Sequence, residues 1–167
     1  KVSSAKLEKD GVHVAYTDAK GSQSLACDRV IVAIGRRPYT KDLLAEGTGV
    51  ALDARGFIEV DDHCRTGAEH VWAVGDCVRG PMLAHKSKEE GLAVADHIAG
   101  LYAHVNYKTI PSVIYTAPEI AWVGLTEEQA QAGGRGVKVG SFPFAASGRA
   151  RAMEAGAGFC KAVADAG

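Results

Sequence analysis

Sixteen consecutive residues, VWAVGDCVRGPMLAHK at positions 71–86, constrain the fold more than any other part of this 167-residue chain. They begin as a short apolar strand that ends at Gly75, whose missing side chain lets a ligand approach the backbone closely. Asp76 then stands at the carboxyl end of the strand, a turn opened by Pro81 follows, and a helix begins after it. Because open α/β sheets bind ligands at the carboxyl ends of their strands, this order predicts an α/β fold with a binding site here.

Asp76 also indicates what kind of ligand binds at this turn. A carboxylate at a strand end accepts hydrogen bonds from sugar or ribitol hydroxyls, and the apolar turn after it can lie against a flat ring. A polyol and a ring together favour FAD. Taken alone, a Gly-Asp pair is also common turn chemistry, so the alternative is a purely structural role. The surrounding residues favour the binding role.

The charge and hydropathy of the chain exclude several classes of partner. The formal net charge is −1, with Lys and Arg scattered among Asp and Glu, so no basic surface for nucleic acid is expected. The longest apolar runs, such as residues 30–34, are too short to cross a bilayer, and no charged-then-apolar leader opens the chain. We therefore expect a soluble, cytoplasmic protein that binds neither nucleic acid nor membrane.

The cysteine and histidine residues indicate neither disulfides nor a metal site. No two cysteines form a CxxC or other close pair, and nothing points to secretion, so all are expected to be reduced thiols. They are Cys27, Cys64, Cys77 and Cys160. The histidines show no metal-ligand spacing, and no metal site is predicted.

The first forty residues combine a hairpin pattern with an apolar run. Residues 12–16 and 22–26 alternate and flank an Asp-Ala-Lys-Gly turn at residues 18–21, which predicts an antiparallel hairpin. Residues 29–34 are then continuously apolar after Arg29 and end at Gly35, the pattern of a strand buried on both faces.

The middle of the chain predicts two short strands and one helix. The strands are expected at residues 57–61 and 71–74, and the helix from near Leu83 to residue 99, with Gly100 as its cap. Gly91 inside this helix costs roughly 1 kcal/mol relative to Ala. Two interpretations stay open for it: a close neighbour such as cofactor or backbone, and a tolerated accident.

A boundary is expected near residues 107–111, and mainly strands follow it. A capping box at residues 126–129 opens one short helix, which Gly133 and Gly134 close. Residues 145–158 are rich in Ala, Gly and Arg without a clear period, and are expected to form a loop. The sequence pattern predicts strands at residues 113–116, 120–124, 137–142 and 159–164. The sequence begins at Lys1 without an initiator Met, Val2 enters what reads as a sheet already under way, and the last strand is followed by a turn but no further strand. We therefore expect the chain to be an internal piece of a longer protein.

A first resemblance is generic and covers the residues before the helix. The second FAD motif shared by many flavoproteins with two dinucleotide-binding domains resembles three segments of this chain in order. They are residues 56–61, Arg65-Thr66 and residues 71–76. The resemblance implies that the motif's Asp, here Asp76, holds the FAD ribitol.

A second resemblance is more specific and spans nearly the whole chain. GPMLAHK at residues 80–86, followed by Glu90-Gly91, is similar to the dihydrolipoyl dehydrogenase family, whereas glutathione and mercuric reductases lack the Met-Leu-Ala-His-Lys run. Two departures from the family's pattern are Ala117 and the missing Pro in residues 67–70. Further segments that fit, in the family's order, are residues 35–38, 111–116, 118–124 and 142–146.

The resemblance implies both a fold and an activity. The fold is α/β, with residues 1–40 as the end of an NAD-binding Rossmann-like domain, 41–107 as a second FAD-binding segment and 108–167 as the first part of an α+β dimerisation domain. The implied enzyme oxidises dihydrolipoyl groups with NAD as acceptor, through FAD and a redox disulfide. It is a homodimer that acts on the lipoyl domains of 2-oxoacid dehydrogenase complexes.

The resemblance also assigns site residues position by position. Asp76 is implied to bind the FAD ribitol and Gly35 to lie beside NAD. Met82, Leu83, Ala84 and His85 are implied to line the flavin, largely through their backbone at a helix start, and Gly75 is implied to let the cofactor approach the backbone. The helix start directs N–H groups and the positive end of its dipole at the flavin's pyrimidine edge, where negative charge accumulates on reduction.

Several of the family's functional parts are absent from these residues. There is no G-x-G-x-x-G motif, no redox cysteine pair and no His-Glu acid-base pair. We therefore expect no catalytic residue in this chain, and the chain alone is expected to be inactive. Two alternatives stay open: another flavoprotein disulfide reductase, of the glutathione or mercuric reductase kind, and a non-catalytic interaction module derived from the scaffold.

Overall fold

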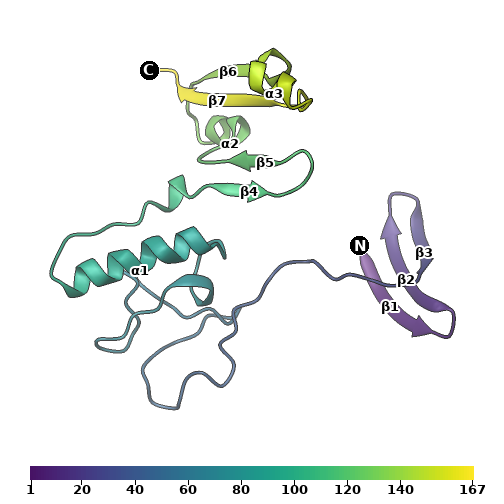
Figure 1. Ribbon diagram of the computed structural model, residues 1–167. Coiled ribbons are helices and arrows are strands. Elements are labelled where there is room, and N and C mark those ends of the chain that lie inside the picture. Colours follow the sequence, from purple (N-terminus) through teal and green to yellow (C-terminus); the bar gives the residue numbers. More distant parts are fainter. The chain divides into compact units, whose positions relative to one another are not determined.

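The computed structural model describes residues 1–167, and the contacts within it divide the chain into two compact units, Lys1–Arg36 and Arg37–Gly167. The first unit is one antiparallel sheet in the order β1-β2-β3 (Figure 1). Its strands are β1 (Val2–Glu8), β2 (Gly11–Asp18) and β3 (Gly21–Cys27).

The hairpin predicted from residues 12–26 is confirmed. β2 pairs with β3 antiparallel from Val12 opposite Cys27 to Asp18 opposite Gly21. The turn uses the chemistry expected of its residues, since Asp18 Oδ1 accepts a hydrogen bond from the Lys20 N–H at 2.7 Å and Gly21 has a φ of +102°. A left-handed φ of this kind suits glycine, which has no Cβ to clash.

The strand predicted at residues 29–34 is wrong. These residues form no strand, and Ile31 and Ile34 are 91% and 94% exposed. A strand buried on both faces needs a neighbour to pair with and layers to cover it. No other segment of the chain pairs with this run, so its apolar character alone does not order it.

The strands predicted at residues 57–61 and 71–74 are also wrong, because only isolated bridges form there. Ile58 bridges Leu52 and Val78, and Trp72 bridges Arg65.

Aspartate side chains compete with ladder formation within and beside the first of these two segments. Asp53 Oδ1 accepts from the Arg55 and Phe57 N–H groups at 2.8 and 2.9 Å. Asp61 Oδ1 accepts from the His63 and Arg65 N–H groups, each at 2.8 Å. These side-chain turns occupy donors that a longer strand ladder would use.

The helix predicted from near Leu83 is confirmed as α1 (Ala84–Ile98), preceded by the short 3₁₀ helix η1 (Gly75–Cys77). Gly100 follows with a φ of +78° and donates to the His97 carbonyl, as expected of a glycine after a helix end. A Cβ at Gly91 would meet no atom within 4 Å, so nothing within the chain requires a glycine there.

Two strand pairs, two short α-helices and two 3₁₀ turns make up the rest of the second unit. The 3₁₀ helix η2 (Tyr107–Thr109) leads into the antiparallel pair β4 (Ser112–Ile114) and β5 (Ile120–Trp122). The predicted capping box is confirmed at α2 (Glu127–Ala132), where Thr126 and Gln129 exchange side-chain bonds with each other's N–H groups at 3.2 and 3.0 Å.

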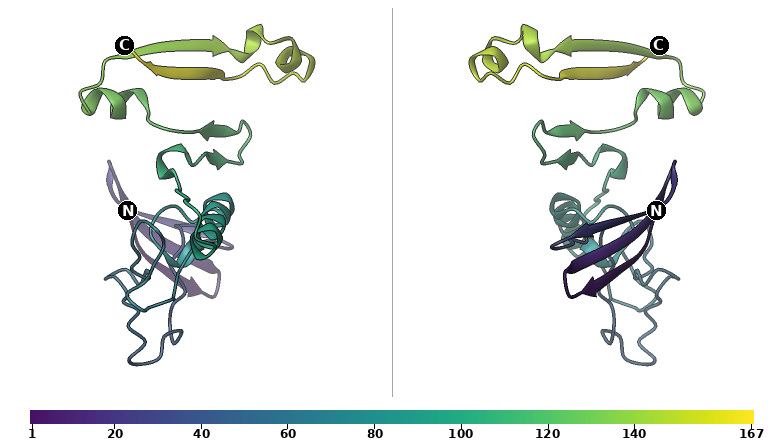
Figure 2. Two further views of the ribbon diagram at one scale, coloured as in Figure 1. Left: turned by 90° about the vertical axis from the view of Figure 1, so that its left-hand side faces the viewer. Right: turned by 90° about the vertical axis from the view of Figure 1, so that its right-hand side faces the viewer.

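The loop predicted at residues 145–158 is partly wrong. The last strand pair, β6 (Val137–Pro143) and β7 (Phe159–Asp165), is joined through η3 (Phe144–Ala146) and α3 (Gly148–Ala152), which lie at one end of the pair (Figure 2). Ser147 starts α3 by accepting a hydrogen bond from the Ala150 N–H at 3.4 Å, and the helix that follows is too short to give a helical period in the sequence. None of the helices combines the length and apolar character needed to cross a membrane.

Candidate functional site

The predicted site residues 75–85 lie together where η1 packs against the start of α1. Gly75 and Asp76 are in η1, Met82 and Leu83 form the approach to the helix, and Ala84 opens α1 with His85 after it. Gly35 belongs to the other unit, where it has a φ of +118° and a Cβ would meet nothing within 4 Å.

Gly75 has a conformation and a position that only glycine suits. Its φ is +86°, and a Cβ on it would lie 3.3 Å from Ser87 Oγ, closer than an ordinary contact. The residue is buried, whereas the Asp76 side chain directly after it is exposed. The turn therefore presents a carboxylate to the exterior from a backbone fixed against the helix.

The start of α1 offers hydrogen-bond donors to a ligand. Leu83 is the N-cap residue and provides no side-chain acceptor, and the first turn contains no acidic side chain. The first N–H groups of a helix have no partner within it and carry the positive end of the helix dipole. A carboxylate acceptor beside backbone donors fits a ligand with polyol hydroxyls at one end and an electron-rich ring edge at the other, as FAD has.

A fully buried ion pair supports this turn from inside, and the sequence analysis missed it. Lys86 Nζ lies 3.0 Å from Glu90 Oε1, and neither side chain has any exposed surface. The Lys86 ammonium donates to the Gly75 carbonyl at 2.9 Å, and Glu90 Oε2 accepts from the Gly75 N–H at 2.8 Å. The signal available in the sequence was a Lys and a Glu four positions apart on one helix face.

Tyr107 contacts the carboxylate of the ion pair. Its hydroxyl donates to Glu90 Oε1 at 2.8 Å, and burial together with this bond raises the pKa of Tyr107 well above its ordinary value. Burial also raises the pKa of the Cys64 thiol, whose sulfur lies 3.9 Å from the Tyr107 hydroxyl. The Arg79 guanidinium stands 5.6 Å over the Tyr107 ring.

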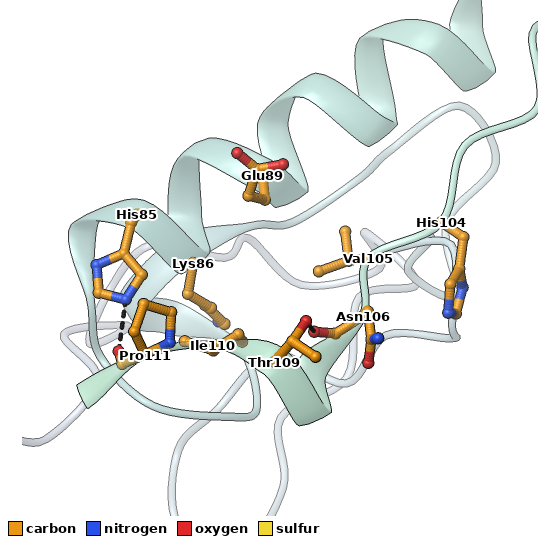
Figure 3. Close-up of a pocket in the computed structure, with 9 residues that line it drawn as sticks. All are labelled: His85, Lys86, Glu89, His104, Val105, Asn106, Thr109, Ile110 and Pro111. Atoms are coloured by element: carbon orange, nitrogen blue, oxygen red, sulfur yellow. Dashed lines mark hydrogen bonds between the residues drawn. The ribbon is translucent and has the colours of Figure 1, made fainter. Parts of the chain in front are cut away.

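The imidazole of His85 is engaged within the chain. Its Nε2 lies 2.8 Å from the Pro111 carbonyl oxygen, and Figure 3 shows the ring directed at Pro111. This bond joins the first turn of α1 to the segment before β4. The two residues share a pocket that is also lined by Lys86, Glu89, His104, Val105, Asn106, Thr109 and Ile110.

Three potential metal ligands come together on the surface of the first unit. Glu8, Asp10 and His13 have ligand atoms within 4.8 Å of one another. The hydrogen bond between His13 Nε2 and Asp10 Oδ1, 3.2 Å long, accounts for this grouping without an ion.

Comparisons with known proteins place this geometry in a family. The family model described as pyridine nucleotide-disulphide oxidoreductase matches residues 1–91, and the model of the dimerisation domain of the same family matches residues 110–167. Dihydrolipoyl dehydrogenase of Cupriavidus necator is 57% identical over 95% of this chain and 34% of its own length. Dihydrolipoamide dehydrogenase of Chaetomium thermophilum is 47% identical over 99% of the chain and 33% of its own length.

Solved structures agree with this assignment. The HOCl-induced flavoprotein disulfide reductase RclA from Escherichia coli superposes with a TM-score of 0.84 at 32% identity, over 99% of this chain and 38% of its own. LpdA from Mycobacterium tuberculosis gives a TM-score of 0.87 at 27% identity, over 99% of this chain and 36% of its own. The chain spans about a third of the length of the curated relatives it matches. The fold predicted from the sequence is confirmed, and the chain belongs to the pyridine nucleotide-disulphide oxidoreductase family.

Proposed function

We propose that this chain belongs to a dihydrolipoyl dehydrogenase, an enzyme that oxidises dihydrolipoyl groups with NAD as acceptor through FAD and a redox disulfide. The observation that carries the proposal is the site at residues 75–85, where an exposed Asp76 carboxylate and the uncapped start of α1 lie on one buried support. The 57% identity to a dihydrolipoyl dehydrogenase over 95% of the chain favours this member of the family.

Each residue of the site has a defined role in this proposal. Asp76 accepts hydrogen bonds from the ribitol of FAD, and Gly75 gives the backbone room for that approach. Backbone N–H groups of Ala84 and His85 face the pyrimidine edge of the flavin, with Met82 and Leu83 beside the ring. FAD, when bound, carries electrons between the substrate thiols and NAD.

The remaining parts of the proposal concern organisation and partners. We assign residues 1–40 to an NAD-binding domain, with Gly35 beside NAD, residues 41–107 to the second FAD-binding segment and residues 108–167 to the dimerisation domain. The match of residues 110–167 to a dimerisation domain supports a homodimer. The proposed partners are the lipoyl domains of cytoplasmic 2-oxoacid dehydrogenase complexes. We assign no catalytic residue to this chain.

The variant Asp76→Ala tests the ribitol assignment in the holoenzyme. We expect it to weaken FAD retention by roughly tenfold or more, since charge-assisted hydrogen bonds contribute about 1.5–3 kcal/mol. Flavin absorbance remaining after gel filtration measures retention. Asp96→Ala, at an exposed position of α1, is the matched control and should keep wild-type retention. Equal retention by both variants would remove Asp76 from the site.

Another flavoprotein disulfide reductase is the second candidate, because RclA shares the fold at 32% identity. The substrate distinguishes the two candidates. The proposed enzyme reduces NAD with dihydrolipoamide as donor, and a purified, FAD-loaded protein that oxidises another dithiol but not dihydrolipoamide would favour the alternative.

A further inference from the structure

Both backbone groups of Gly75 are bonded to side chains of α1, and its carbonyl also accepts a longer bond from the Val78 N–H at 3.3 Å. Its N–H donates to Glu90 Oε2 at 2.8 Å and its carbonyl accepts from Lys86 Nζ at 2.9 Å. The two bonds hold the peptide groups on either side of Gly75. They therefore fix its φ of +86° and the direction in which the chain continues. The next residue is Asp76.

The pair that makes these bonds is costly to bury, and its carboxylate is fully engaged. Removing two charges from water costs several kcal/mol for each ion, and good geometry with further hydrogen bonds must offset it. Glu90 Oε1 receives both the Lys86 ammonium at 3.0 Å and the Tyr107 hydroxyl at 2.8 Å. Every oxygen of the buried carboxylate therefore has a donor.

The backbone near the pair leaves room for the lysine. A Cβ at Gly80 would lie 3.2 Å from Lys86 Cε, so a glycine there allows the Lys86 stem to pass. Gly80 also has a φ of +97°, a conformation that L side chains rarely adopt. Sequence and geometry are thus adapted to bring this ammonium to the Gly75 carbonyl.

The pair also joins the two halves of the proposed flavin site. Lys86 directly follows Ala84 and His85 in the first turn of α1, while its ammonium is bonded to the residue before Asp76. The distance between the carboxylate and the helix donors is therefore set by one rigid connection. A long ligand such as FAD is sensitive to that distance at both of its ends.

We propose that Lys86 and Glu90 are positioning residues for FAD, which hold the Gly75–Asp76 turn and the start of α1 in the one arrangement that fits the cofactor. The inference rests on the proposed function and deepens it. Neither side chain touches the flavin, because both are completely buried within the chain. Tyr107 assists by orienting the Glu90 carboxylate.

The decisive variant removes both charges together. In the double variant Lys86→Met/Glu90→Gln no unpaired charge stays buried. The amide introduced at position 90 keeps an acceptor for the Gly75 N–H, whereas the Gly75 carbonyl loses its Lys86 donor and keeps only the longer bond from the Val78 N–H. We expect a folded protein with an unfolding midpoint close to that of the wild type and an FAD dissociation constant raised by about tenfold, the effect of one lost hydrogen bond. The visible circular dichroism of the bound flavin should change as well, which a merely structural role does not require.

The control exchanges the same residue types at exposed positions of the same helix. Lys88→Met/Glu89→Gln should leave the dissociation constant, the circular dichroism of the flavin and the unfolding midpoint as in the wild type. If the buried double variant does not fold, Tyr107→Phe decides instead, since it removes only one bond to Glu90. We expect a several-fold rise in its dissociation constant together with a changed flavin signal.

The outcomes distinguish failure of the positioning role from failure of the proposed function. A folded buried double variant, or in its place Tyr107→Phe, that matches the wild type in FAD affinity and flavin circular dichroism overturns the positioning role. If Asp76→Ala still releases FAD in that case, the proposed function stands and only the inference fails. A wild-type holoenzyme preparation that contains no flavin overturns both.

Discussion

The sheet of the first unit and residues 40–107 of the second unit are ordered in opposite ways. Nearly every residue of β1, β2 and β3 is paired in an antiparallel ladder, yet none of them is buried. In residues 40–107 only α1 and short 3₁₀ turns are regular. Almost all buried side chains of the molecule nevertheless lie there, namely Thr40, Phe57, Ile58, Cys64, Val78, Lys86, Glu90 and Ala93.

The difference shows that regular pairing can occur without burial and burial without regular pairing. A ladder satisfies its backbone groups internally and can remain ordered without a fully buried side chain. An irregular buried backbone must find partners for the same groups among side chains. Glu90, Lys86 and the turn-forming aspartates supply them here. A candidate binding site occurs in the second kind of region, where side chains determine the direction of the backbone.

The largest test of this contrast removes one partner of the buried ion pair. Glu90→Ala leaves the Lys86 ammonium buried without its counter-ion and the Gly75 N–H without its acceptor, and we expect the free energy of unfolding to fall by about 3–5 kcal/mol. Glu89→Ala changes an exposed residue of the same helix and should alter it by no more than about 0.5 kcal/mol. Urea unfolding followed by circular dichroism measures both. Similar values for the two variants would mean that the pair does not support the irregular region.

A smaller effect is expected from apolar packing, and it compares the two regions directly. Val78 has no exposed surface, so Val78→Ala should lower the free energy of unfolding by about 2 kcal/mol. Leu7 in β1 is 82% exposed, and Leu7→Ala removes more apolar atoms at almost no cost. The same urea titrations apply. A larger loss for Leu7→Ala would reverse the contrast between the regions.

The smallest effect concerns pH and distinguishes two aspartates. Burial raises the pKa of Asp61, but the Arg65 and His63 N–H groups outweigh it and the pKa lies below its usual value. The pKa of Asp10 is lowered chiefly by its hydrogen bond with His13. A carboxyl group with a lowered folded pKa stabilises the fold above its unfolded pKa of about 3.9, and this stabilisation is lost as pH falls through the folded pKa.

We therefore expect acid below about pH 4 to destabilise the wild type more than Asp61→Asn. High salt should weaken the contribution of the exposed Asp10–His13 pair more than that of Asp61, whose pKa is lowered chiefly by backbone hydrogen bonds and less by the charges of His63 and Arg65. Unfolding midpoints between neutral and acidic pH, at low and high salt, measure these differences. Equal salt sensitivity of Asp10→Asn and Asp61→Asn relative to the wild type would contradict the distinction.

Local signals predicted the elements that depend only on nearby residues. The Asp18–Gly21 turn, the Thr126 capping box and the Gly100 helix end each act within a few positions, and all three are found as expected. The strand predicted at residues 29–34 depends on pairing partners elsewhere, and the one at residues 57–61 competes with the side chain of Asp53, which accepts from the Phe57 N–H. Apolar pattern alone does not contain that information.

The candidate site was predictable in part for the same reason. Gly75, Asp76 and the helix start are close in sequence, so one motif contained them all. The buried Lys86–Glu90 pair and its Tyr107 partner could not be predicted from the sequence pattern. Tyr107 lies 17 positions from Glu90, and no periodic pattern connects the two. The Lys86 and Glu90 spacing was readable, but an i,i+4 pair on a helix is more often exposed than buried.

The buried pair also has a consequence for how this sequence can evolve. Each partner exchanged alone leaves an uncompensated charge in the interior, whereas an exchange of both can restore stability. Two substitutions must then occur together, or the first must survive a large loss of stability. Among related sequences, positions 86 and 90 should change jointly or not at all, while the exposed positions 88 and 89 beside them drift independently.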